Sequence, residues 1–188
     1  MDKRWARSGE RCEVVLAGSG GQGLVFLGQL LAESALDAGF HVVQTQSYGV
    51  ASRGGFSKSE VIIASHPIAY PMVMNPSAVL ALTDEAFGQY AKTNTKAVLL
   101  YDSDRVSPPF EASENWIGLP FEREASRLGL GASFNVMGLS ALMAVGTPVS
   151  SNTLIDLLSK KGDTPNNRRN LQAAHRGLEL LACGEDEG

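Results

Sequence analysis

The sequence predicts an α/β fold in three layers, with a mainly parallel, Rossmann-like sheet between helices and a helical C-terminal part. Short apolar runs alternate with helical patterns through the first hundred residues. The runs are almost continuously apolar, which is typical of strands covered on both faces. The 188 residues suit one domain. We expect an N-terminal extension over 1–10, a single domain over 11–183 and an acidic tail over 184–188.

The first half supplies most of the predicted sheet. A helix is predicted over residues 23–38, because Leu24, Leu27 and Leu31 form one apolar stripe and Gly39 suits the position after its end. Thr83 is the candidate N-cap of a second helix over 84–91. The prolines of residues 66–76 predict an extended crossing. Strands are predicted over 13–17, 40–44, 60–64, 79–82 and 97–101.

The second half is mainly helical. Pro108 and Pro109 interrupt the chain before a further strand predicted over 116–120. The pattern over 134–145 is apolar on nearly all sides, so we expect this helix to be buried in the domain or in an interface. Helices are predicted over 121–128, 134–145, 153–159 and 167–181.

Charge and composition exclude several classes of function. A net charge of -4 argues against nucleic acid as the main partner, since binding phosphates along a duplex needs a basic face. No run of 18 apolar residues occurs, and the first residues lack the apolar core of a signal peptide, so we expect a cytoplasmic chain that does not span a membrane. The two cysteines and three histidines show no metal-ligand spacing, which predicts no metal site.

A glycine-rich motif follows the first predicted strand directly. It consists of Gly18, Ser19, Gly20, Gly21, Gln22 and Gly23 and matches GxGxxG between a strand and a helix. Such a turn presents backbone N–H groups and the positive end of a helix dipole to an anion. Glycines needed only for a tight turn and close helix packing are the alternative. The extra glycine and the amide of Gln22 favour a ligand-binding loop.

A second loop over residues 47–57 brings further polar groups. Its candidate ligand-binding residues are Ser47, Tyr48, Arg53, Gly54 and Gly55. An arginine beside two glycines can direct a bidentate fork at a phosphate or carboxylate. A surface arginine paired with a nearby acid is the alternative, and the tyrosine is equally suited to stacking on a base or to capping the core. Together the two loops predict a site for a phosphate-bearing ligand.

Candidate catalytic groups are scarce. A dinucleotide site would place an acid after the second strand, where Gln44, Thr45 and Gln46 stand instead. The serines of both loops have no neighbouring base, so no catalytic residue is predicted. Asp84 and Asp102 follow strands, where ligand sites of open α/β sheets lie, although helix capping explains Asp84 as well. This combination suggests a subunit that binds and positions a ligand while partner chains carry out the reaction.

These motifs resemble the gamma subunit of 2-oxoacid:ferredoxin oxidoreductases over about residues 13–177. The resemblance rests on GSGGQG at 18–23, QTQSYG at 44–49, SRGGFSKSEV at 52–61 and VLALTDEA at 79–86. QTQSYG and YDSD at 101–104 look most like the 2-oxoglutarate branch, with indolepyruvate or pyruvate oxidoreductases as the alternative. The chain departs from the family where Val50-Ala51 replace a usual Pro-Glu and where Ser77 follows Pro76 in place of Asp.

The resemblance implies a complex that oxidatively decarboxylates a 2-oxoacid to an acyl-CoA, or runs the reverse, with ferredoxin as electron partner. Thiamine diphosphate, magnesium and iron–sulfur clusters would belong to alpha, beta and possibly delta subunits, so this chain would not be active alone. Coenzyme A would be the co-substrate that the glycine turn, Tyr48 and Arg53 help to bind while the subunit closes over the active site. A free-standing nucleotide-dependent oxidoreductase is the alternative, and it would bind NAD by itself.

Overall fold

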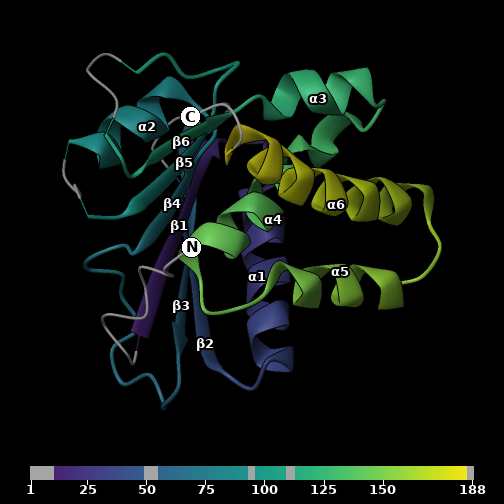
Figure 1. The fold of residues 1–188 in the computed structure, drawn as a ribbon. Coiled ribbons are helices and arrows are strands. Elements are labelled where there is room, and N and C mark those ends of the chain that lie inside the picture. The colour runs from purple at the N-terminus through teal and green to yellow at the C-terminus, as the bar shows by residue number, and fades with distance from the viewer. Residues whose placement is uncertain (1–10, 49–54, 93–95, 109–112, 186–188) are drawn as a thin grey trace.

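A six-stranded sheet runs through the computed structural model, in the order β2-β3-β1-β4-β5-β6 (Figure 1). The structure describes residues 11–48, 55–92, 96–108 and 113–185, so the predicted extension over 1–10 and residues 186–188 lie outside it. The strands are β1 (Arg11–Ser19), β2 (His41–Tyr48), β3 (Phe56–Ala64), β4 (Ala78–Ala81), β5 (Val98–Asp102) and β6 (Trp116–Leu119).

Five of these strands run in the same direction. The pairs β1–β4, β4–β5 and β5–β6 are parallel, whereas β3 is antiparallel to both β1 and β2. The prediction of a mainly parallel sheet is therefore confirmed. It differs from a dinucleotide-binding sheet at one side, because β3 separates β2 from β1, which are neighbours in the usual order.

The two described ends of the second loop belong to a pair of antiparallel strands. Strands β2 and β3 pair along their whole length, from His41 opposite Ala64 to Tyr48 opposite Ser57. Both strands are longer than predicted, so Ser47 and Tyr48 belong to β2 rather than to a loop. The sequence pattern missed these ends because they are polar, and the backbone ladder that holds them does not depend on apolar side chains.

Helices cover the two faces of the sheet unequally. Helices α1, α4, α5 and α6 lie on one face and α2 on the other, which gives the three layers expected (Figure 1). The helices are α1 (Leu24–Asp37), α2 (Asp84–Ala91), α3 (Phe121–Arg127), α4 (Phe134–Gly146), α5 (Ser151–Lys160) and α6 (Pro165–Glu185), with a 3₁₀ turn η2 (Gly131–Ser133) before α4. None of these helices is both long and apolar enough to cross a membrane, within the residues described.

Local signals correctly predicted the start of α2 and the end of α1. Thr83 caps α2, since its hydroxyl accepts a hydrogen bond from the N–H of Ala86 at 3.3 Å. Gly39 follows the C-cap of α1 with φ of 85°, a left-handed conformation that glycine adopts without strain. Helix α6 is longer than the predicted 167–181, since it starts at Pro165 and continues through Glu185, two residues into the predicted tail.

Helix α4 is the centre of the larger core. Its residues Met137, Leu139, Leu142 and Met143 have no exposed surface, because α4 packs between the sheet and the outer helices. The prediction that this helix is buried is confirmed, and the interior of the domain, rather than a subunit interface, covers it.

Residues 65–77 cross from β3 to β4 without regular structure, as predicted, and are held from the first strand. Glu13 is 7% exposed, and its Oε2 accepts hydrogen bonds from the N–H groups of Met74 and Asn75, each at 2.7 Å. Arg11 donates to the carbonyls of Tyr70 and Met72 at 2.8 and 2.7 Å. These contacts fix the backbone of the crossing while the side chains of Tyr70, Met72 and Met74 remain exposed.

Candidate functional site

The glycine motif forms the turn between β1 and α1. Gly21 and Gly23 have φ of 94° and 74°, and Gly23 is the N-cap of α1 without a side-chain cap. A Cβ on Gly18 would overlap the side-chain oxygen of Gln22, so this glycine leaves room for Gln22 to fold back over the turn. The strand, tight turn and helix start predicted from the motif are therefore confirmed.

The amide of Gln22 is engaged within the turn. Its Oε1 accepts a hydrogen bond from the N–H of Ser19 at 2.7 Å, and its Nε2 donates to the carbonyl of Leu82 at 3.4 Å. The expectation that this amide serves a ligand directly is not supported by these contacts. Gln22 instead ties the turn to the end of β4, the strand beside β1.

Only part of the turn's N–H groups are free for a ligand. Gly20 donates to the carbonyl of Gly55 at 2.9 Å, and Gln22 donates to the carbonyl of Ser19 at 3.3 Å. Among the described residues, the N–H groups of Gly21, Gly23 and Leu24 have no acceptor. These three donors lie at the positive end of α1, where an anion is stabilised.

The bond from Gly20 to Gly55 also shows that the two predicted loops meet. Strand β3 starts beside the end of β1, with Phe56 opposite Ser19. Ser47 is exposed near the end of β2. Arg53 and Gly54 lie outside the described residues, as does the Val50-Ala51 departure from the family pattern. The structure thus brings the described ends of both loops to one edge of the sheet.

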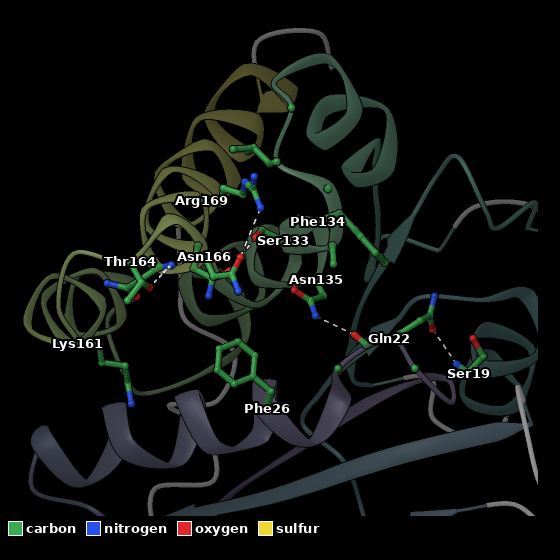
Figure 2. A pocket seen from close by; sticks show the side chains of 18 of the residues that line it. Ser19, Gln22, Phe26, Ser133, Phe134, Asn135, Lys161, Thr164, Asn166 and Arg169 are labelled. Atoms are coloured by element: carbon green, nitrogen blue, oxygen red, sulfur yellow. Dashed lines mark hydrogen bonds between the residues drawn. The ribbon is translucent and has the colours of Figure 1, made fainter.

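A cavity of about 860 Å³ opens beside the glycine turn (Figure 2). Three helices begin at its wall, namely α1, α4 and α6, so three positive dipole ends face the same space. Phe26 projects into it from the first turn of α1 and is 38% exposed. The polar and charged residues that line it are Ser19, Gln22, Arg105, Ser133, Asn135, Lys161, Thr164, Asn166, Asn167, Arg169 and Asn170.

The lining of the cavity includes cations although the whole chain is acidic. None of the described residues that line it is an Asp or Glu, whereas Arg105, Lys161 and Arg169 all line it. Lys161 pairs with Glu33 at 2.5 Å, and Arg105 pairs with Glu122 at 2.5 Å while its guanidinium lies 5.7 Å from the ring of Phe134. A volume of this size suits a cofactor-sized ligand, and the lining suits one with negative charge.

The two acids at strand ends serve the fold. Asp84 accepts a hydrogen bond from the N–H of Ser107 at 3.0 Å. Asp102 is fully buried and accepts from the N–H groups of Asp104 and Glu122 at 3.1 and 3.2 Å, which joins the end of β5 to α3. Burial raises the pKa of Asp102 to about 6, and the nearby carboxylates of Asp104 and Glu122 add to this. Neither acid lines the cavity.

Sequence reasoning missed the far wall of the cavity. Arg105, Asn135, Lys161 and Arg169 come from four separate segments, and no local motif joins them to the glycine turn. One signal was available in the sequence, because Thr164-Pro165 is a typical helix start. It would have predicted the beginning of α6 and thereby a position for Arg169 near the positive end of that helix.

The family model for pyruvate ferredoxin/flavodoxin oxidoreductase matches residues 13–180. The chain belongs to this family. Within it, the 2-oxoglutarate synthase subunit KorC of Methanocaldococcus jannaschii is 36% identical over 186 residues, which span 96% of this chain and 98% of KorC. The indolepyruvate oxidoreductase subunit IorB of Archaeoglobus fulgidus is 29% identical over 53% of this chain and 50% of its own length.

Two solved members of the family share the fold. The gamma subunit of a keto/oxoacid ferredoxin oxidoreductase from Geobacter sulfurreducens superposes with a TM-score of 0.74 and 32% identity, covering 92% of this chain and 97% of that one. The 2-oxoglutarate:ferredoxin oxidoreductase from Magnetococcus marinus, solved with 2-oxoglutarate, coenzyme A and succinyl-CoA bound, superposes with a TM-score of 0.79 and 25% identity, covering 93% of this chain but 31% of that one.

The predicted identity is therefore confirmed at the level of the subunit. The chain is the gamma subunit of a 2-oxoacid:ferredoxin oxidoreductase, a class of oxidoreductase. Its relatives are named as subunits, which agrees with a chain that acts in a larger assembly. In the Magnetococcus enzyme the matching region is under a third of a longer chain.

Proposed function

We propose that this gamma subunit serves a 2-oxoglutarate:ferredoxin oxidoreductase and that it binds coenzyme A at the glycine turn. Alpha and beta subunits, and possibly a delta subunit, would hold thiamine diphosphate, magnesium and the iron–sulfur clusters and pass electrons to ferredoxin. The KorC relative and the Magnetococcus enzyme, whose crystals contain coenzyme A, support the choice of substrates. The residues that we assign to coenzyme A are the turn over 18–23 and, from the second loop of the sequence, Ser47, Tyr48, Arg53, Gly54 and Gly55.

One observation carries the proposal. The free N–H groups at the start of α1 open onto a cavity lined by three cations, while no acidic side chain lines it among the described residues. Coenzyme A is a large ligand with a pyrophosphate, a further phosphate and an adenine ring, so it needs anion donors together with an apolar surface. The turn supplies donors to the pyrophosphate, and Phe26 supplies the apolar surface.

The chain's own residues would bind and orient, whereas the reacting groups come from elsewhere. Within the described residues, no group of three or more His, Cys, Asp and Glu side chains is placed to hold a metal ion. Thiamine diphosphate in the partner chains would supply the decarboxylation chemistry. In the oxidative direction, the coenzyme A thiol loses its proton and its sulfur gains the acyl group, carbon dioxide leaves and two electrons pass to ferredoxin. The gamma subunit contributes by holding the thiol carrier in place and, we propose, by closing over the active site.

A matched pair of glycine variants tests the assignment in the assembled complex. Gly21 and Gly39 both have positive φ and both have open space where a Cβ would stand, but only Gly21 lies in the turn. Alanine in a left-handed conformation costs roughly 1–2 kcal/mol at either position. We expect Gly21→Ala to raise the KM for coenzyme A severalfold and Gly39→Ala to leave it unchanged. Equal effects of the two variants would refute coenzyme A binding at the turn.

The 2-oxoacid is tested with the same complex. We expect ferredoxin reduction to be fastest with 2-oxoglutarate, and compare it with pyruvate and indolepyruvate as separate substrates. A clear preference for indolepyruvate or pyruvate would replace the 2-oxoglutarate assignment while leaving the subunit identity intact. Arg53→Ala should also raise the coenzyme A concentration needed for half-maximal rate, because the guanidinium would no longer pair with a phosphate.

A further inference from the structure

The wall of the cavity opposite the glycine turn is formed by the end of α5 and the start of α6. We propose that this wall, with Arg169 as its central residue, binds the 3′-phosphate of the adenosine end of coenzyme A. The inference rests on the proposed function, since it assigns a second part of the same ligand to a second part of the same cavity. It also gives the ligand a direction, with its charged end toward α6 and its thiol arm leading away.

Of the three cations that line the cavity, Arg169 is the one without a carboxylate partner among the described residues. Among the described residues it makes no ion pair, and its Nη1 donates only to the amide oxygen of Asn166 at 3.4 Å (Figure 2). Lys161 and Arg105, by contrast, are each paired with a glutamate that does not line the cavity. A guanidinium that lines a cavity without a carboxylate partner is suited to a bidentate bond with a phosphate.

The start of α6 adds to the attraction at the same place. The helix begins at Pro165, and the hydroxyl of Thr164 accepts a hydrogen bond from the N–H of Asn167 at 3.2 Å. Thr164, Asn166, Asn167 and Arg169 all line the cavity. The 21-residue helix therefore directs its positive end and a guanidinium to one space, and Lys161 lies on the same wall.

A buried side chain points independently to a ligand in this cavity. Asn135 is 6% exposed, lines the cavity, and donates from Nδ2 to the carbonyl of Gln22 at 2.8 Å. Its Oδ1 accepts no hydrogen bond from the described part of the chain. This amide oxygen at the cavity wall is therefore available as an acceptor, and a ligand that carries N–H or O–H groups, as adenosine does, would donate to it.

The positions of the negative charges on coenzyme A indicate that its adenosine end, rather than its thiol arm, binds in this cavity. Coenzyme A carries its pyrophosphate and its 3′-phosphate on the two sides of one ribose, and the arm beyond is uncharged. The cavity likewise offers two anion-binding elements, the turn at the start of α1 and the wall at the start of α6, with Phe26 lining the space. The thiol arm has no group that needs either element.

Coenzyme A and dephospho-coenzyme A, which lacks only the 3′-phosphate, test the inference in the assembled oxidoreductase. We expect the wild-type complex to have a KM for dephospho-coenzyme A roughly tenfold or more above that for coenzyme A, since a charge-assisted phosphate bond is lost. Arg169→Ala should raise the KM for coenzyme A to that for dephospho-coenzyme A and leave the latter unchanged. Arg169→Lys, which keeps the charge but not the fork, should fall between.

The neighbouring arginine provides the matched control. Arg168 is exposed, pairs with Asp163 at 3.0 Å and does not line the cavity, so Arg168→Ala should keep the wild-type ratio of the two KM values. A wild-type ratio in Arg169→Ala would overturn the inference. If Gly21→Ala then raised both KM values, coenzyme A binding at the turn would stand without the α6 subsite. If neither variant changed either KM, both proposals would fail.

Discussion

Helices α4 and α6 cross at Gly177, and this crossing sets one wall of the cavity. A Cβ on Gly177 would overlap the carbonyl oxygen of Met137 and lie 3.0 Å from its carbonyl carbon. That oxygen belongs to the helix backbone at a fully buried residue, so it cannot swing aside as a flexible side chain would. We predict that Gly177→Ala forces α6 away from α4 by roughly 1 Å, the shift that restores a normal carbon–oxygen contact.

The expected cost combines two opposing terms. Overpacking of a tight core contact costs about 1–3 kcal/mol, while replacing glycine by alanine inside a helix returns up to about 1 kcal/mol. We therefore expect Gly177→Ala to lower the free energy of unfolding by about 1–2 kcal/mol, which at this chain length lowers Tm by about 2–8 °C. Gly88 in α2 is the control, because a Cβ there would have no atom within 4 Å. Gly88→Ala should stabilise the chain by up to about 1 kcal/mol.

Urea unfolding of the two variants and the wild type, followed by circular dichroism, measures both effects. A second measurement, the KM for coenzyme A in the assembled complex, should rise in Gly177→Ala, since the start of α6 lines the cavity. Gly88→Ala should leave this KM unchanged. If Gly177→Ala were as stable as Gly88→Ala, α4 and α6 could not be in backbone contact, and the geometry of the cavity wall described above would be wrong.

Three further predictions concern buried groups. Glu13→Gln should lower the free energy of unfolding by about 2 kcal/mol in urea, because both oxygens of Glu13 accept hydrogen bonds and the amide N–H group would face either Arg11 Nε or the N–H of Met74; wild-type stability would contradict this. Burial raises the pKa of Asp102 from 3.8 to about 6, so the folded state binds its proton more tightly than the unfolded state. Stability should therefore fall by about 2 kcal/mol as pH rises from 4 to 6, and Asp102→Asn should remove that part of the pH profile; an unchanged profile would show that Asp102 is solvated. Cys183 is exposed, whereas Cys12 is buried with its pKa raised to about 12, so a thiol reagent should modify only Cys183 in the folded chain, and rapid modification of both would contradict the burial of β1.

Several features could be predicted because they depend on residues close together in the chain. The turn after β1 needs glycines at Gly21 and Gly23, where φ is positive, and the cap of α2 needs the hydroxyl of Thr83 three residues before an N–H. The apolar runs of β1 and β4 showed in the same way that helices cover both faces of the sheet. Each of these signals is contained in a few consecutive residues, so no tertiary contact was needed to interpret it.

The hairpin of β2 and β3 could be predicted only in part from the sequence. The apolar halves of both strands were predicted, but the polar halves were not: Ser47 was assigned to a loop, and Lys58 was assigned to no element. They are strand because Ser47 and Lys58 face each other across a backbone ladder that starts at His41 and Ala64. Cross-strand register is a property of two segments together, and a single-segment pattern does not contain it.

The sequence by itself therefore determined the α/β class, the glycine turn, the family and the burial of α4. Only the tertiary structure decided that α4 lies within the domain and that the cavity joins the turn to α6. The bond from Asn135 to Gln22 spans 113 residues, and that from Lys161 to Glu33 spans 128. Residues so far apart are brought together by the packing of whole helices on the sheet, which depends on the complete core, so the cationic wall around Arg169 is visible only in the folded chain.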